Sequence, residues 1–434
     1  MAQLPAQSFP RWSPDTVTIL PGAGNTRLAA YHLSPPKGGV ERVRITARVR
    51  LNGGKAYLYV YGGTPRNEFL GYRESEPVEA KDSTDVTLSL EGWASAEMDS
   101  VTIGLAFYGA GSAVLQPPVI EVEPVPEYPL NAYTTEYLRE FFGYVRENAL
   151  DRDSMDWPLL ESDARALAAR ADSMPDMYEL LNFTLRRIDK HSFLSAPRVH
   201  RGWTNGNNET GAIDPNLKYP TGRRVEKRMA YLRVPGVSSG HPKTLSAYAD
   251  SLRNLIARLD GPKVDEWVVD LRSNTGGNCW PMLSGLGPLL GEGVCGYFMQ
   301  RDGTQAKAWS YRDGGSYLND DLMHEVEQPY KTYRPARVAV LYGPKTSSSA
   351  EVVAIAFRGR PDTRSFGRPT GGYSTGNRTY RLSDGAAILL TVSVYGDRHK
   401  QAYGEEVIPD VPVSPARGVD AASEAAAAWL RAGR

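Results

Sequence analysis

Residues 336–357 read ARVAVLYGPKTSSSAEVVAIAF, a strand-length apolar run, a tight turn, a cluster of serines and a predicted helix. A strand that leads directly into a helix lifts a serine hydroxyl to the edge of a sheet. It also points the first backbone N–H groups of the helix at whatever that hydroxyl attacks. Serines before a helix also serve as ordinary N-caps, so this stretch alone leaves both interpretations open.

Composition and charge exclude several classes of function. The chain has 434 residues, of which 41% are hydrophobic, and its 50 basic and 50 acidic residues cancel. Such a chain has no global field that attracts nucleic acid, and none of its apolar runs approaches the about 18 residues of a membrane span. The six histidines show no HExxH or paired ligand spacing, so we expect no metal and no cofactor.

The start of the chain and its cysteines bear on localisation. Residues 1–27 contain neither the basic segment nor the apolar segment of a signal peptide. The localisation is open: periplasmic or secreted if a signal was removed, and cytoplasmic otherwise. Cys279 and Cys295 are too few for a disulfide scaffold. Whether they pair is also open, two buried free thiols being the commoner outcome.

The pattern along the chain divides it into three parts. Residues 1–126 contain short alternating strands and predict a β-sandwich, jelly-roll-like in type. Residues 127–200, after a proline-rich linker, have helical spacing. Residues 201–434 alternate strands and helices, which predicts an α/β core with helices on a largely parallel sheet. The predicted core elements are strands at 229–234, 266–271, 337–342, 379–382 and 387–395, and helices at 245–259, 281–290, 351–357 and 421–431.

A second informative stretch is VVDLRSNTGGN, residues 268–278, in which a buried strand runs into a loop with paired glycines. The glycines let the backbone approach a substrate and present its N–H groups. Together with the serine cluster, this stretch resembles the carboxyl-terminal processing, or tail-specific, serine peptidase family. The resemblance covers about residues 134–413 and implies a ClpP/crotonase-like core with a mixed sheet and packed helices. Its motifs occur in the family's order at 188–193, 270–277, 345–351, 367–372, 383–385 and 408–411.

The resemblance implies a nucleophile and an oxyanion hole. Carried over position by position, it makes Ser348 the nucleophile, although a shift of one residue would select Ser347 or Ser349 instead. The oxyanion hole would combine the N–H of Ser349 with one from the turn at Gly276 and Gly277. Such donors stabilise the charge that develops on the carbonyl oxygen, and loss of one typically costs ~10²–10³ in rate.

The base departs from the usual family pattern. Many members place a lysine shortly after the motif at 367–370, but Tyr373 stands there, and no lysine lies between Lys345 and Lys400. The chain instead resembles the tricorn-core-like branch, whose base is a histidine at the end of the helical part, and His191 has that place. A neutral imidazole near pH 7 suits proton abstraction from a serine hydroxyl.

A histidine base also needs a partner that orients its ring. The same branch places a glutamate near the tail motif, which makes Glu405 and Glu406 the candidates. Ser192 is an alternative partner, although an ordinary surface hydroxyl is the commoner role for such a serine. Lys190 stands where that branch has a serine.

Many family members insert a peptide-binding PDZ domain after the helical part. Here about 30 residues, with a polar loop at 202–211, separate His191 from the strand near residue 224. That is too few for a domain of roughly 80 residues or more. Capture of a peptide or protein substrate is then expected from the core, from the β-domain or from the cavity of a homo-oligomer.

The sequence therefore predicts a serine peptidase that cleaves peptide bonds through an acyl-enzyme on Ser348, with His191 as general base. Two alternatives stay open. One is a catalytically silent protein that binds an apolar ligand or a peptide on the same fold. The other is an esterase that uses the same triad, because ester and peptide substrates need the same nucleophile, base and oxyanion hole.

Overall fold

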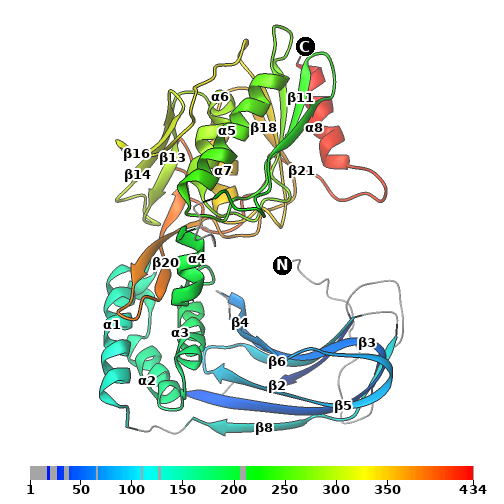
Figure 1. Ribbon diagram of the computed structural model, residues 1–434, viewed down its shortest axis with the longest axis vertical. Coiled ribbons are helices and arrows are strands. Elements are labelled where there is room, and N and C mark those ends of the chain that lie inside the picture. The colour runs from blue at the N-terminus through cyan, green and yellow to red at the C-terminus, as the bar shows by residue number, and fades with distance from the viewer. Residues whose placement is uncertain are drawn as a thin grey trace.

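The computed structural model describes residues 17–19, 27–33, 39–64, 67–108, 111–125, 129–205 and 212–433. Most of the segment at 1–27, the predicted boundary at 126–127 and residues 206–211 of the polar loop lie outside these residues. Figure 1 shows an all-β region and a bundle of helices below, and an α/β core above.

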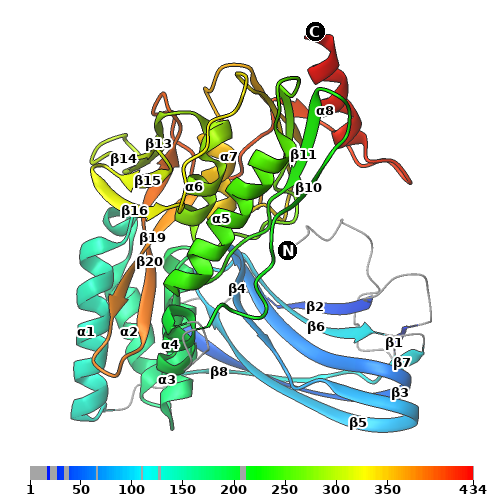
Figure 2. The same cartoon turned by 45° about the horizontal axis from the view of Figure 1, so that its top comes forward.

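The N-terminal region is all-β, as the alternation predicted. It contains β1 (Val17–Ile19), β2 (Arg27–Leu33), β3 (Val40–Thr64), β4 (Asn67–Glu74), β5 (Val78–Ser95), β6 (Ser100–Tyr108), β7 (Ser112–Leu115) and β8 (Val119–Pro124). The 25-residue β3 bends at Gly53 and Gly54, where positive φ angles of 76° and 93° favour glycine. β3 pairs with β7 and β8 before the bend, with β4 and β6 after it, and with β5 on both sides, so the sheet curves strongly (Figure 2).

The helices that follow share one core with this sheet. They are α1 (Ala132–Asn148), the 3-10 turn η1 (Arg152–Ser154), α2 (Trp157–Ala168) and α3 (Met174–Ile188). Their apolar faces pack against side chains such as Ile45 and Leu58 of β3 in a single buried cluster. The buried guanidinium of Arg187 in α3 pairs with Asp163 of α2 and with Glu97 of the β-region. The two regions are therefore held together by both apolar and charged contacts.

The α/β core contains two sheets. The remaining elements are β9 (Phe193–Ser195), α4 (Pro197–Asn205), β10 (Thr221–Arg224), β11 (Met229–Arg233), α5 (Pro242–Leu259), β12 (Glu266–Asp270), α6 (Cys279–Leu290), β13 (Gly293–Met299), β14 (Lys307–Arg312), β15 (Gly315–Leu318), β16 (Asp321–Glu325), β17 (Arg337–Tyr342), α7 (Ser349–Ala356), β18 (Thr363–Gly367), β19 (Thr375–Arg381), β20 (Ala387–Gly396), β21 (Val411–Pro412) and α8 (Ala421–Ala432). The first sheet, β10-β11-β12-β17-β18-β21, is parallel except for β10, as predicted. The second, β16-β15-β14-β13-β20-β19 with β9 on β20, is antiparallel, and its strands β13 to β16 were not predicted.

Helices cover both faces of the parallel sheet. One buried cluster joins β11, β12 and β17 to α5, α6 and α7, through side chains such as Trp267 and Leu252. A second cluster packs Ala426 and Leu430 of α8 against Val268 and Leu341 on the opposite face. Continuous apolar runs such as 337–342 form these strands because both of their faces are buried.

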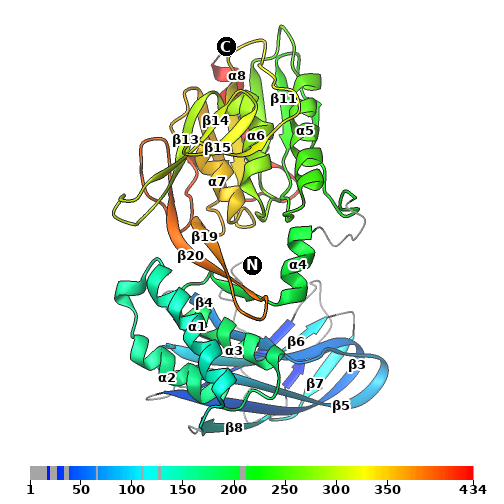
Figure 3. The ribbon, with the colours of Figure 1, turned by 60° about the vertical axis from the view of Figure 1, so that its left-hand side comes forward.

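The β19–β20 hairpin joins the core to the helical bundle (Figure 3). Its far end carries Ile388 and Leu390 into the cluster shared by the helices and the β-region. At its tip, the Ser383 hydroxyl donates to Glu140 of α1 at 2.7 Å, and Tyr178 of α3 donates to Asp384. The hairpin therefore fixes α1 and α3 relative to the core.

Two further findings concern the cysteines and membranes. Cys279 and Cys295 are both buried and free. Among the residues that the structure describes, no helix has the length and apolar character needed to cross a membrane.

Candidate active site

The turn between β17 and α7 holds Ser348 in an unusual backbone conformation. Its φ of 55° and ψ of −122° lie in a region that residues other than glycine rarely adopt. The N–H of Ser348 donates to Glu351 at 2.8 Å. The half-buried Ser348 thus sits on a strained strand-to-helix elbow, and the first N–H groups of α7 follow it directly.

Glu351 is fully buried and fixes this elbow. One carboxylate oxygen accepts from Ser348 N and from Tyr373 N at 2.9 Å. The other accepts from the Thr370 hydroxyl at 2.5 Å and from Gly372 N at 3.1 Å. Burial raises the pKa of Glu351 to about 7, while all four donors favour the charged form. A single carboxylate therefore holds both the elbow and the 370–373 segment.

The glycine turn after β12 packs against the elbow. Thr346 donates its hydroxyl to Leu271 O at 2.9 Å, and Ser347 N donates to the carbonyl of the buried Asn274. The Asn274 side chain accepts from Gly276 N at 2.9 Å. A Cβ at Gly276, where φ is +102°, would lie only 3.0 Å from the Cβ of Ser348. Glycine at this position keeps the space beside the serine open.

Two backbone N–H groups of these segments are candidate oxyanion donors. Because Gly276 N is engaged by Asn274, the turn offers the N–H of Gly277 instead. Ser349 is the first residue of α7, so its N–H has no acceptor within the helix. The Ser349 hydroxyl donates to Gly277 O at 2.6 Å and ties the two segments together.

His191 lies three residues beyond the last residue of α3. Asp189 accepts from His191 N at 2.7 Å and from Ser192 N at 3.1 Å, which fixes the chain as it leaves the helix. Nδ1 of the ring lies 2.8 Å from the hydroxyl of Thr375 on β19. Burial is the largest influence on the ring and lowers the pKa of His191 to about 4, so the imidazole is neutral at pH 7.

His191 and Ser348 are connected indirectly, through Tyr373 and Glu351. The His191 ring packs edge-on against Tyr373, with 5.3 Å between ring centroids, and Tyr373 N shares the Glu351 carboxylate with Ser348 N. Buried Tyr395 on β20 forms a side-chain hydrogen bond with Ser348, which offsets part of the burial-driven increase in the pKa of Tyr395. Among the hydrogen bonds of the described residues, none joins the His191 ring directly to the Ser348 hydroxyl.

The two glutamates predicted as orienting partners lie near His191, beside Lys190 and Gly372. Glu405 pairs with Lys190 at 3.1 Å, and Glu406 lies near Gly372, where a Cβ would be 3.3 Å from its Cγ. The structure joins Nδ1 of His191 to Thr375 instead of joining it to either carboxylate. Sequence reasoning missed Thr375, because a threonine at the start of a polar strand carries no local signal of this role.

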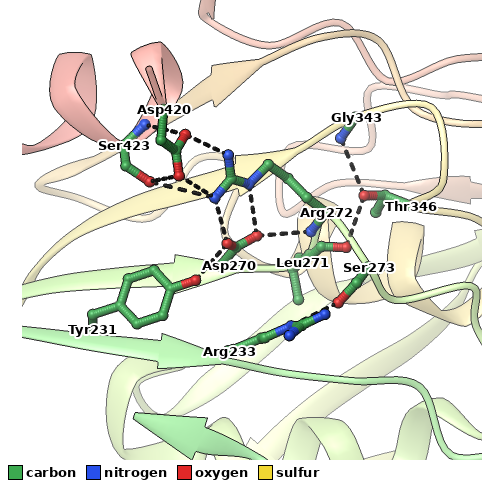
Figure 4. Close-up of polar contacts among 10 residues, drawn as sticks. All are labelled: Tyr231, Arg233, Asp270, Leu271, Arg272, Ser273, Gly343, Thr346, Asp420 and Ser423. Atoms are coloured by element: carbon green, nitrogen blue, oxygen red, sulfur yellow. Dashed lines mark hydrogen bonds and ion pairs between the residues drawn. The ribbon is translucent and has the colours of Figure 1, made fainter. Parts of the chain in front are cut away.

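A charged network ties the glycine turn to the end of the chain (Figure 4). Arg272 donates to Asp270 at 2.7 Å and to Asp420, at the start of α8, at 2.6 Å. Tyr231 of β11 donates to the same Asp270 carboxylate at 2.6 Å. Contacts with β11 and with the start of α8 therefore hold the end of β12, from which the glycine turn begins.

Part of the α/β core resembles a known peptidase family. Residues 228–413 match the family model described as Peptidase family S41. The nisin-resistance protein of Lactococcus lactis subsp. lactis is 25% identical over 297 residues, which are 68% of this chain and 86% of that protein. The chloroplastic carboxyl-terminal-processing peptidase 2 of Arabidopsis thaliana is 29% identical over 198 residues, 44% of this chain and 35% of that protein.

Among solved structures, a lipoprotein from Streptococcus agalactiae has a similar fold. The TM-score is 0.57 at 22% sequence identity, and the match covers 70% of this chain and 98% of that one. At this identity the likeness concerns the fold alone.

Proposed function

Because residues 228–413 match the model of peptidase family S41, we propose that the chain is a serine peptidase with Ser348 as nucleophile. We also propose His191, which lies before the matched residues, as the general base. The observation that carries the proposal is the strained backbone of Ser348, held by the buried carboxylate of Glu351. Strain of this kind costs ~1–3 kcal/mol and persists where function requires it.

In the proposed reaction, the Ser348 oxygen attacks the carbonyl carbon of the scissile bond and its proton passes to Nε2 of His191. The N–H groups of Gly277 and Ser349 hold the oxygen that becomes negative. The tetrahedral species collapses to an acyl-enzyme, and the leaving amine takes the proton from His191. Water then attacks the acyl group with His191 again as base, which frees the acid and restores Ser348.

The surroundings of His191 support its part in this sequence. Neutral imidazole has one N–H and one lone pair. If Nδ1–H donates to the Thr375 hydroxyl, the lone pair lies on Nε2, the atom to which the proposal assigns the serine proton. We therefore propose Thr375 as the group that orients the base, and we keep Glu405 and Glu406 as the weaker candidates.

Peptide cleavage is tested with a defined mixture of unstructured peptides and mass spectrometry of the products. We expect new peptide termini with the wild type and with the matched control Ser347→Ala, and none with Ser348→Ala. Products that persist with Ser348→Ala would contradict the assignment of the nucleophile. Turnover of a simple ester with no peptide cleaved would favour the esterase.

The relative named nisin-resistance protein suggests a second candidate function, resistance to nisin. Expression of the wild type and of Ser348→Ala in a nisin-sensitive bacterium separates two routes to it. Resistance that requires Ser348 would indicate cleavage of nisin. Resistance that both proteins confer would indicate a binding protein that acts without catalysis.

A further inference from the structure

Two connected cavities lie beside the glycine turn. The first, of about 560 Å³, reaches Thr275 in the turn itself. The second, of about 580 Å³, lies against helix α4 and is lined by Val199 and Trp203. Both are lined by Asp214, Ser238 and Ser239, so they form one groove that leads from the turn to α4.

The α4 side of this groove is apolar, exposed and fixed in place. Val199 is 65% exposed and Trp203 is 38% exposed, although apolar side chains of this size are usually covered. Gly240 N donates to the Trp203 carbonyl at 2.9 Å, and a Cβ at Gly240 would lie 3.4 Å from the indole. These contacts attach Trp203 to the segment that follows β11. The position of the indole relative to the core is therefore set before any ligand binds.

The groove lies within reach of a peptide held at the candidate active site. Val237 pairs with Gly277 of the turn, and Gly240 lies three residues further along the chain. Three residues span at most about 11 Å. A substrate side chain within about four residues of the scissile bond can thus reach Trp203.

The charged residues that line the groove affect which substrate side chain it can bind. Exposed Arg198 and partly exposed Asp214 both line the α4 cavity and have opposite signs. Within the α4 cavity they give no preference for one charge, whereas Trp203 and Val199 favour an apolar side chain. The cavity next to the turn adds Lys218 and Arg233, so that part of the groove is basic.

We propose that this groove is a specificity site of the peptidase, in which Trp203 and Val199 hold an aromatic or branched aliphatic side chain of an extended peptide substrate. The inference rests on the proposed function, since it names what that active site accepts. It adds that recognition occurs on α4, within about four residues of the bond that is cleaved.

Binding to the inactive Ser348→Ala protein tests this inference without catalysis. The probes are fluorescein-labelled octapeptides of glycine and serine with one phenylalanine, leucine or serine moved through each position, followed by fluorescence anisotropy. We expect phenylalanine or leucine at one position to bind about tenfold more tightly than serine. Adding Trp203→Ala should abolish this preference, as should Val199→Asp. The control Tyr333→Ala, which removes an aromatic side chain that is 66% exposed and outside the groove lining, should leave it unchanged.

Circular dichroism and the unfolding midpoint of each variant establish that it is folded. A preference that survives both groove variants, or the lack of any apolar preference, would overturn the inference. Failure of the proposed function has a different signature: wild-type protein would not react with a fluorophosphonate, while the Trp203-dependent preference would persist.

Discussion

Replacement of Glu351 by glutamine removes one of its two acceptor oxygens while keeping its shape. Four donors converge on this buried carboxylate, two on each oxygen. The amide nitrogen of glutamine costs least at the position of the oxygen that faces Thr370 and Gly372. There the Thr370 hydroxyl can rotate and accept from it, whereas the other oxygen faces two backbone N–H groups that cannot accept. Gly372 N would then face another donor and lose its partner.

One buried N–H without an acceptor costs about 1–3 kcal/mol. We therefore expect Glu351→Gln to lower the free energy of unfolding by that amount in urea titrations. Because Gly372 precedes Tyr373, which contacts the His191 ring, the displaced segment should also slow reaction with a fluorophosphonate by about tenfold or more. Glu351→Ala leaves all four donors without the carboxylate and frees the strained elbow. Its rate should fall by ~10²–10³, the cost of losing an oxyanion donor.

The control is Glu325→Gln, at an exposed position on β16, which should change stability by less than about 0.5 kcal/mol. Burial raises the pKa of Glu351 to about 7, so the wild-type rate should fall as the pH drops below 7 and the carboxylate is protonated. Glu351→Gln lacks this titration. Wild-type stability and reaction rate in Glu351→Gln would refute the role assigned to the carboxylate.

Four further outcomes follow from the same site. The folded-state pKa of His191, about 4, lies below the ~6.5 of an unfolded histidine, so the unfolded chain binds more protons between these values and stability falls as the pH drops through that window. The difference in unfolding free energy between wild type and His191→Ala should change by about 3 kcal/mol between pH 7 and pH 4; a constant difference would contradict the burial of the ring. Thr375→Val should slow fluorophosphonate labelling about tenfold and Thr375→Ser should restore it, whereas equal rates would exclude the hydroxyl as orienting group. Gly276→Ala puts a methyl group 3.0 Å from the Ser348 Cβ at a positive φ and should lower labelling at least 10²-fold, which a normal rate in the folded variant would disprove. Asp420→Ala leaves Arg272 paired with Asp270 alone and also removes the N-cap of α8, where Asp420 accepts from Ser423 N at 3.2 Å. It should cost about 1–3 kcal/mol in urea unfolding, because the Asp420 side chain is 50% exposed; a loss above about 4 kcal/mol would contradict a weak ion pair.

The sequence predicted the elements that position the nucleophile because their signals are local. The buried apolar runs 338–342 and 267–269 each became part of a parallel strand next to a turn of the site. By contrast, strands β14 and β16 contain polar residues and are held by antiparallel neighbours. Their sequences have no hydrophobic periodicity from which a strand could be predicted. The jelly-roll and ClpP/crotonase-like descriptions stay predictions.

The support around the site could not be predicted, because it depends on contacts between distant residues. Thr375 is 184 positions from His191, and Thr370 and Glu351 meet only after the 370–373 segment folds over the elbow. Asn274 lay within a recognised motif, yet its role became visible only from its contacts with Gly276 and Ser347. The three-part division of the chain also stays a prediction, although one buried cluster spans the β-region, the helices and the hairpin.

The central claim, that Ser348 and His191 act as nucleophile and base, is tested most directly by intact mass after treatment with a fluorophosphonate. The proteins are the wild type, Ser348→Ala and His191→Ala. We predict one adduct on the wild type, none on Ser348→Ala and strongly slowed formation on His191→Ala. An adduct that survives Ser348→Ala would place the nucleophile elsewhere, with Ser347 or Ser349 the next to test. A folded wild type that forms no adduct would contradict the claim and favour the silent binding protein.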